Sequence, residues 1–163
     1  SELFDIEGIL VEKAVSLYSS EYVRLTKTEE KLFHGTIEVL KQLRSQGFRL
    51  AIATGKSQNG AENASMRLGL KPLFDSIHGI LPGTPGKPHP AVLIRAIHAL
   101  DVKPEECIMI GDTTFDLDLA HAIGVRTVAV SWGVHSVETL QTRNPSVCVH
   151  SFDELLSWVL AQQ

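Results

Sequence analysis

The sequence predicts an α/β fold built on a doubly wound parallel sheet, and three observations lead to this prediction. From Thr36 onward, stretches with helical periodicity alternate with short apolar runs. These runs end in Gly, Asp or Thr, as the strands of a parallel sheet do where they lead into helices. A chain of 163 residues is also long enough to bury a core without disulfide bonds.

Helical and strand patterns follow one another along this region. The expected elements are a helix through Ile37, Leu40 and Leu43, a strand Phe48–Ala53, a helix carrying Met66 and Leu68, a strand Ser76–Ile80, a helix Ala91–Leu100, a strand Cys107–Ile110, a helix Phe115–Ile123, strands Arg126–Val130 and Val147–Val149, and a closing helix Asp153–Leu160.

Glycine and proline mark several ends of these elements. The first helix is expected to end at Gly47 and the second near Gly69, because glycine is the usual residue just past a helix C-terminus. The stretch LPGTPGKPHP, residues 81–90, is expected to be a loop. Its four prolines fix φ and lack N–H donors, so it cannot form a regular helix or strand.

The segment before Lys31 has a different pattern. Apolar residues recur there at three- and four-residue steps, which predicts an amphipathic helix; they are Ile6, Leu10, Ala14, Leu17, Tyr18, Tyr22 and Leu25. The polar stretch TKTEEK that follows is expected to be a linker. We therefore expect an N-terminal helical segment over residues 1–30 and an α/β domain over residues 31–163.

Composition and charge exclude several classes of partner. The formal net charge is −4 and no dense cluster of lysine and arginine is present, so binding to nucleic acid is not expected. No apolar run approaches the roughly 18 residues of a membrane span, and the start SELFDIEG lacks signal-peptide features. Cys107 and Cys148 lie in apolar runs that suit reduced thiols. We expect a cytoplasmic protein without membrane partners.

Chemically useful side chains follow two expected strands and occupy the proline-rich loop. Thr54 and Gly55 offer a hydroxyl and backbone N–H groups where a helix is expected to begin, an arrangement that suits an anion. Asp112 and Asp116 place two carboxylates where a strand leads into a helix, which suits Mg²⁺. Lys87 is the lysine of the loop. Ligands bind at the carboxyl edge of such sheets, so these residues are the candidate site. The same residue pattern would also arise from ordinary helix N-caps and a solvent-exposed lysine.

Together these residues resemble the haloacid dehalogenase-like hydrolase superfamily, and its phosphoglycolate-phosphatase-like branch in particular. Thr54 corresponds to the second family motif, Lys87 to the third, and Asp112 with Asp116 to the fourth. Their separations, 87 − 54 = 33 and 112 − 87 = 25 residues, are of the size usual in that branch. Further similarities are Phe33-His34-Gly35, LFD at Leu73–Asp75 and SWGVH at Ser131–His135.

The resemblance implies a Rossmann-like core that hydrolyses a small phosphorylated metabolite with Mg²⁺ through an aspartyl-phosphate. In such a core, Thr54 and Gly55 bind the transferring phosphoryl group, and Lys87 neutralises the charge of the nucleophile and phosphate. Asp112 ligates Mg²⁺, and Asp116 orients metal-bound water or Lys87. The implied catalytic residues are Thr54, Lys87 and Asp112, and the implied metal residues are Asp112 and Asp116.

The family's first motif, which ends the central strand, has one candidate in this sequence. In one interpretation Asp5 is the nucleophile and Glu7 the general acid. In the other, Asp5 is the N-cap of a remnant cap helix, because only Leu3 and Phe4 precede it where a buried central strand needs about five apolar residues. Both interpretations remain open.

The second interpretation has a structural consequence. The chain would lack the central strand, whose place is between the strands that lead to Thr54 and Asp112. Backbone groups inside a sheet need partners, so a partner chain, a swapped element or a rearranged sheet would have to fill the gap. The chain would then be a truncated, non-catalytic family member that keeps a phosphate and metal site, for example as an intertwined homodimer.

Overall fold

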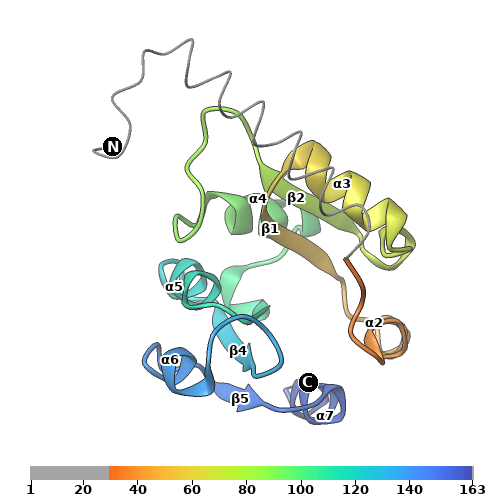
Figure 1. Cartoon of the computed structure of the whole chain (residues 1–163), viewed down its shortest axis with the longest axis vertical. Coiled ribbons are helices and arrows are strands. Elements are labelled where there is room, and N and C mark those ends of the chain that lie inside the picture. The colour runs from red at the N-terminus through yellow and green to blue at the C-terminus, as the bar shows by residue number, and fades with distance from the viewer. Residues whose placement is uncertain (1–29, 163) are drawn as a thin grey trace. The chain divides into compact units, whose positions relative to one another are not determined.

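The computed structural model describes residues 30–162. The chain divides into two units, Ser1–Phe33 and His34–Gln163, and helices and strands alternate along the second (Figure 1). The N-terminal helix expected over residues 1–30, and the candidate motif at Asp5 and Glu7, lie outside the described residues.

The second unit contains six α-helices, two short 3₁₀ helices and five strands in the described part of the chain. In order they are α2 (Thr36–Ser45), β1 (Ala51–Ser57), α3 (Gln58–Arg67), η1 (Lys71–Leu73), β2 (Ser76–Ile80), α4 (Ala91–Leu100), η2 (Pro104–Glu106), β3 (Ile108–Gly111), α5 (Thr114–His121), β4 (Arg126–Val130), α6 (Val137–Gln141), β5 (Val147–Val149) and α7 (Phe152–Leu160).

Each strand pair found in residues 30–162 is parallel, which confirms the α/β fold with a parallel sheet. β1 pairs with β2, while β3, β4 and β5 form a second group in that order. Residue partners such as Ala53 with His78 and Met109 with Thr127 fix the two registers. Within residues 30–162, no strand lies between β1 and β3, so the two groups are not joined by a hydrogen-bond ladder.

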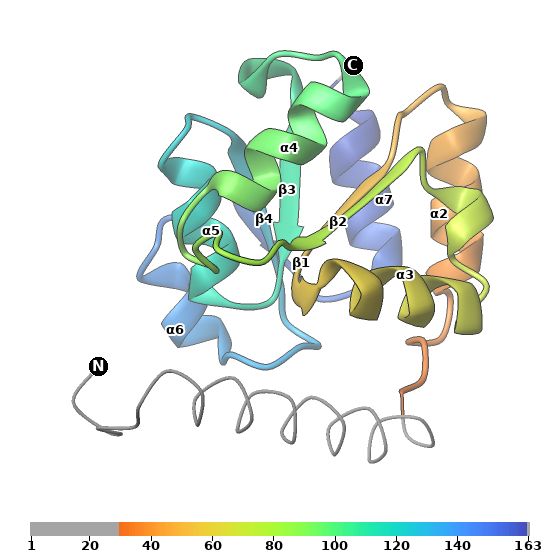
Figure 2. The same ribbon diagram turned by 90° about the horizontal axis from the view of Figure 1, so that it is seen from above.

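Helices cover both faces of the strands. Ile108 of β3 packs against a cluster with Leu43 of α2 and Leu155 of α7, whereas the next residue, Met109, packs against Ile97 of α4. Figure 2 shows α7 beside α2, with α5 on the opposite side of β3 and β4. A strand covered on both faces buries side chains on both, and β4 is accordingly buried from Thr127 to Val130 and ends in the apolar run Val128–Val130.

The first strand differs from the prediction. It spans Ala51–Ser57 rather than Phe48–Ala53, because the N–H of Leu50 donates to the Asp75 carboxylate (2.7 Å) before ladder pairing with β2 begins. The strand also continues through Thr54 and Gly55. α3 begins only at Gln58, with the Ser57 hydroxyl accepting from the N–H of Gly60 (3.2 Å). The expectation that Thr54 opens a helix is therefore wrong.

Several other boundaries agree closely with the sequence. α2 ends at Ser45, and Gly47 adopts a φ of 86° that favours glycine, as expected for a residue just past a helix. Residues 81–90 contain neither helix nor strand, and β2, β4, β5 and α4 have the expected bounds. Over residues 30–162, every helix is too short or too polar to cross a bilayer.

Asp75 connects η1 and β2 to the preceding elements. Its carboxylate accepts from the guanidinium of Arg44 in α2 (3.0 Å) as well as from the N–H of Leu50. The hydrogen bond from Leu50 is the largest cause that holds the pKa of Asp75 below its ordinary value of 3.8, and Arg44 adds to it. These bonds stabilise the folded state most when the carboxylate is ionised.

We expect Asp75→Ala to lower the free energy of unfolding by about 1 kcal/mol at neutral pH, because the charged hydrogen bonds that it removes are partly exposed. The pKa is lower in the folded state, so the stabilisation is complete above the unfolded-state pKa and is lost as the pH falls through the folded-state pKa. Urea unfolding of both proteins from neutral to strongly acidic pH checks this. A difference that stays constant over that range would contradict the assignment.

Candidate active site

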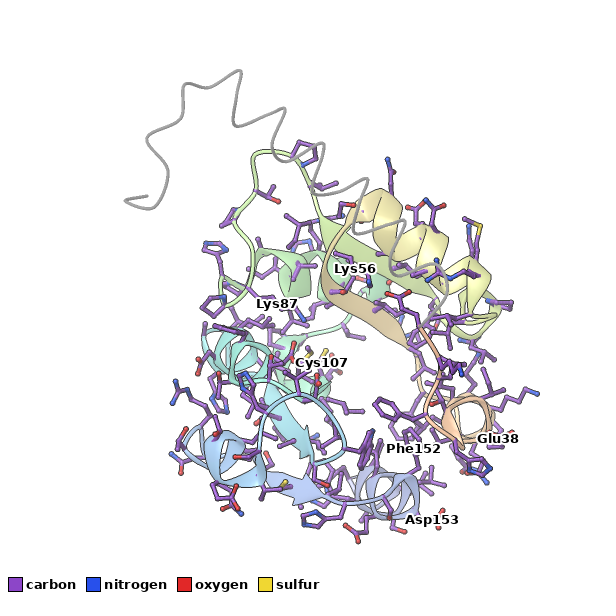
Figure 3. All side chains as sticks on the ribbon, viewed as in Figure 1. Glu38, Lys56, Lys87, Cys107, Phe152 and Asp153 are labelled. Atoms are coloured by element: carbon purple, nitrogen blue, oxygen red, sulfur yellow. The ribbon has the colours of Figure 1, made fainter. Side chains whose placement is uncertain are left out.

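Lys87 joins the end of β1 to the start of α5. Its ammonium donates to the carbonyl oxygen of Ala53 (2.8 Å) and pairs with Asp116 (2.5 Å between Nζ and Oδ1). The two side chains are only 15% and 9% exposed. Figure 3 shows Lys87 in the loop that follows β2, close to α5. A charge this buried is costly unless it is paired, so the loop holds Lys87 in one position at the carboxyl edge of the strands.

Asp116 is held by the N-cap of its own helix. The Thr113 hydroxyl donates to Asp116 Oδ2 (2.7 Å), and the N–H of Asp116 donates back to that hydroxyl (3.3 Å). Both carboxylate oxygens of Asp116 therefore have protein partners, Lys87 on one and Thr113 on the other. Of the two roles expected for Asp116, this arrangement favours the orientation of Lys87 over a bond to a metal ion.

The loop after β4 holds Asp112. The N–H of Val134 donates to Asp112 Oδ2 (2.8 Å), and the N–H of His135 donates to the backbone oxygen of Asp112 (3.1 Å). A Cβ atom built on Gly133 would collide with the Asp112 side chain, so glycine permits this close approach. Asp112 is thus positioned by residues about twenty positions away in the sequence.

Thr54 and Gly55 lie in the second half of β1. Thr54 is half-buried and its hydroxyl accepts a hydrogen bond from the N–H of Lys56 (3.3 Å), while Gly55 is exposed. The pairing of β1 with β2 is irregular between Ala53 and Ser57. This irregular end of the strand directly follows the carbonyl group that Lys87 contacts.

Direct contacts bring only part of the predicted site together. Lys87 and Asp116 pair, and Lys87 bonds to the residue before Thr54. Asp112 directly precedes the N-cap of α5, the helix that carries Asp116, and is bound by the loop 133–135. Among residues 30–162, no three His, Cys, Asp or Glu side chains form a ready metal site. The roles given to Thr54, Gly55, Lys87 and Asp112 remain predictions.

His135 is a neighbour of the site that the sequence did not single out. Its Nδ1 accepts from the N–H of Thr114 (3.1 Å), and its ring lies 6.1 Å from that of Phe115 between centroids. His89, two residues after Lys87, contacts α4 instead: its Nδ1 accepts from the N–H of Ala91 at the start of that helix (3.2 Å). His135 is the last residue of the SWGVH similarity noted in the sequence. Its contact with Thr114 could not be predicted, because it depends on how the loop after β4 folds back toward α5.

Comparison with known proteins shows which family the chain belongs to. Residues 3–130 match the family model described as haloacid dehalogenase-like hydrolase. The chain belongs to this family. The match covers both Lys87 and the segment from Asp112 to Asp116, and it confirms the resemblance based on the motifs.

Relatives within the haloacid dehalogenase-like family include two curated phosphatases. The chain is 32% identical over 153 residues to a probable phosphatase, IndB, of Dickeya dadantii, covering 93% of this chain and 66% of that protein. It is 32% identical over 152 residues to a phosphoglycolate phosphatase of Colwellia psychrerythraea, covering 93% and 67%. The chain thus spans about two thirds of the length of these relatives.

A solved structure from the same family has a closely similar fold. It is a haloacid dehalogenase-like hydrolase from Streptococcus pneumoniae, with a TM-score of 0.82 and 29% identity. The alignment covers 95% of this chain and 72% of that one. Both the parallel α/β architecture and the similarity to phosphatases of this family are therefore established for the chain.

Proposed function

We propose that this chain is the core of a phosphatase that hydrolyses a small phosphorylated metabolite with the help of Mg²⁺. The observation that carries the proposal is the buried ammonium of Lys87, fixed between Asp116 and the end of β1. Two relatives that are named as phosphatases support the reaction class.

Lys87 and Thr54 suit a transferring phosphoryl group because their positions are set before the ligand arrives. Phosphoryl transfer needs mainly positioning and positive charge near the oxygens of the transferred group. Lys87 supplies the charge, and the Thr54 hydroxyl supplies a hydrogen bond to one phosphoryl oxygen. A donor that is already oriented stabilises the transition state without the cost of reorganisation.

Asp112 is the described residue that fits Mg²⁺ best. Magnesium keeps several waters in most proteins and takes one or two carboxylates together with substrate phosphate, so it does not require a cluster of three protein ligands. Asp112 is a half-buried carboxylate beside Lys87's partner helix, and the loop 133–135 fixes its position. Bound Mg²⁺ would neutralise negative charge on the phosphate.

The family resemblance implies that the nucleophile is an aspartate. In that reaction an aspartate oxygen forms a bond to phosphorus as the bond to the leaving oxygen breaks, and water then cleaves the aspartyl-phosphate. Asp5 is the candidate for this role within the 163 residues, and it lies outside the described part of the chain.

The proposed function predicts that the chain releases phosphate from p-nitrophenyl phosphate in the presence of Mg²⁺. Thr54→Val keeps the shape of the side chain and removes the hydroxyl, so we expect turnover to fall by about 10- to 100-fold, the equivalent of one hydrogen bond to a charged group. Phosphate release as a function of time measures this. Thr142→Val, a matched change in the turn after α6, is the control and should keep full activity. No phosphate release from the unaltered chain would reject the proposal.

A further inference from the structure

Two large apolar side chains, Phe115 and Val134, are exposed beside the candidate site. Among the described residues, the exposed large apolar side chains are Phe33, Met66, Ile94, Ile110, Phe115 and Val134. Val134 is the most exposed of these, at 78%, and Phe115 is 49% exposed. Exposed apolar groups that lie close together often mark a binding surface, so we asked what surrounds these two.

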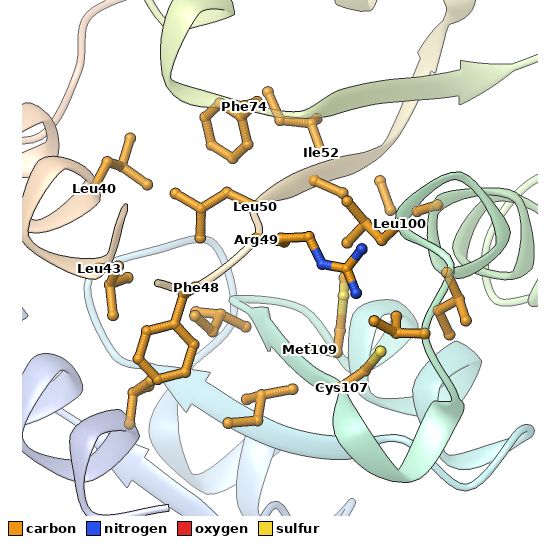
Figure 4. A pocket seen from close by; sticks show the side chains of 18 of the residues that line it. Leu40, Leu43, Phe48, Arg49, Leu50, Ile52, Phe74, Leu100, Cys107 and Met109 are labelled. Atoms are coloured by element: carbon orange, nitrogen blue, oxygen red, sulfur yellow. The ribbon is translucent and has the colours of Figure 1, made fainter. Parts of the chain in front are cut away.

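Ile110 is exposed for a different reason. It lines a cavity of about 590 Å³ that is bordered by β1 and β3. Figure 4 shows the largely apolar wall of this cavity, with Leu50 and Met109 among its residues. Phe115 and Val134 do not line the cavity. Their exposure therefore belongs to the surface formed by α5 and the loop after β4.

Val134 is fixed directly beside Asp112. Its N–H donates to Asp112 Oδ2 (2.8 Å), and a backbone nitrogen lies about 1.5 Å from its own Cα, so the Cα of Val134 is within roughly 4.3 Å of that oxygen. The same loop approaches the Asp112 side chain through Gly133, where an added Cβ would collide with it. An exposed apolar side chain thus borders the carboxylate that we propose as the Mg²⁺ ligand.

Phe115 reaches the same loop from the first turn of α5. Its ring and the ring of His135 lie 6.1 Å apart between centroids and are tilted by 56°, an arrangement common for aromatic pairs. The N–H of Thr114 donates to Nδ1 of His135 (3.1 Å), which fixes the imidazole ring against α5. We call Phe115, Val134 and His135 the apolar rim. Contacts within the protein hold the rim in position beside Asp112.

An ion pair lies one helical turn beyond Phe115. Asp118 of α5 pairs with Arg143 (2.9 Å), and the two side chains are partly exposed. Because the pair has no net charge, it attracts an anionic group only weakly. The surroundings of the apolar rim therefore favour an uncharged apolar group over one that carries a carboxylate.

We propose that the apolar rim binds the leaving group of the substrate, and that this group is uncharged, apolar and about the size of a ring. The inference rests on the proposed phosphatase function, because a phosphoryl group held near Lys87, Thr54 and Asp112 is what brings a leaving group to the rim. Such a group is only a few bonds from phosphorus, which is close enough to reach a neighbour of Asp112. Contact with the rim removes apolar surface of both partners from water, and this favours binding.

Three phosphonates test the proposal with the full chain in the presence of Mg²⁺. Their carbon–phosphorus bond is not hydrolysed by a phosphatase, so titration calorimetry measures binding alone. Benzylphosphonate should bind at least about tenfold more tightly than ethylphosphonate, because its ring buries additional apolar surface. 3-Phosphonopropionate, which carries a carboxylate in place of the ring, should bind no more tightly than ethylphosphonate. Tighter binding of 3-phosphonopropionate than of benzylphosphonate would overturn the proposal.

Substitutions in the apolar rim should reduce the preference for benzylphosphonate over ethylphosphonate. Phe115→Ala removes one ring and should lower this preference at least about fivefold. Val134→Thr keeps the side-chain shape and the N–H that binds Asp112, and its hydroxyl should lower the preference about threefold. Met66→Ala is the matched control, because Met66 is 51% exposed on α3, and it should leave the preference unchanged. Equal preferences in the Phe115→Ala and Met66→Ala variants would contradict the assignment of the rim.

The outcomes separate this inference from the proposed function. If benzylphosphonate and ethylphosphonate bind equally tightly and both compete with inorganic phosphate, the phosphate site stands and the role of the apolar rim is wrong. If neither binds at millimolar concentration, both proposals fail. Equal binding together with a dimer that Phe115→Ala dissociates, measured by light scattering, would assign the rim to a second copy of the chain and would also overturn the inference.

Discussion

Replacement of Lys87 by methionine is expected to lower phosphate release by at least about 100-fold, the loss typical when one preorganised charge-stabilising group is removed. The free energy of unfolding should also fall, by roughly 3 kcal/mol, because the change leaves the carboxylate of Asp116 buried without its ammonium partner. Steady-state phosphate release and urea unfolding measure the two effects on the same protein.

A second substitution separates these two effects. Adding Asp116→Leu to Lys87→Met removes the unpaired charge, so we expect most of the lost stability to return, whereas phosphate release should stay low. If the double variant recovered activity together with stability, Lys87 would be a structural residue and its assignment to the phosphate site would be wrong.

Replacement of Asp112 by asparagine is expected to raise the Mg²⁺ concentration needed for half-maximal activity by at least about tenfold, and to lower activity at saturating Mg²⁺. Asparagine retains an oxygen that can accept the N–H of Val134, so the fold should persist. It removes the negative charge that favours a hard divalent cation. A titration of phosphate release against Mg²⁺ measures the shift.

Asp118→Asn is the matched control for this change. Asp118 lies in the same helix, α5, and pairs with Arg143 (2.9 Å) rather than with the candidate site. We expect its Mg²⁺ dependence to equal that of the unaltered chain. Identical Mg²⁺ titrations for Asp112→Asn and the unaltered chain would exclude Asp112 as a metal ligand.

The strand pattern was predictable because parallel strands and helices leave distinct apolar periods. Ser76–Ile80, Arg126–Val130 and Val147–Val149 were predicted with the bounds that the structure shows. The start of β1 was not, because the N–H of Leu50 donates to the Asp75 carboxylate and pairing with β2 begins only at Ala51. The helix Val137–Gln141 was also missed, since five residues are too few to reveal a helical period.

The site was predictable in its residue types and less so in its contacts. Motif spacing identified Thr54, Lys87, Asp112 and Asp116 as candidate site residues. It could not show that one carboxylate oxygen of Asp116 binds Lys87 and the other binds Thr113. The contact of Lys87 with Ala53 depends on the path of the loop 81–90. The two contacts of Lys87 join residues 29 and 34 positions apart, so no local pattern in the sequence encodes them, whereas the Thr113–Asp116 contact is a local helix cap.

The separation between β1 and β3 could not be predicted from local sequence patterns either. Each strand could be predicted from its own residues, whereas strand order depends on which backbone lies between them. Within residues 30–162, β1 pairs only with β2 and β3 only with β4.

The most direct test of the central claim is a crystal structure of the chain grown with Mg²⁺ and a phosphate analogue such as tungstate. We predict one anion within hydrogen-bond distance of both Lys87 Nζ and Thr54 Oγ1, with Mg²⁺ between the anion and the Asp112 carboxylate. An anion bound elsewhere at saturating concentration, with Lys87 and Thr54 contacting only protein, would contradict the proposed phosphate site.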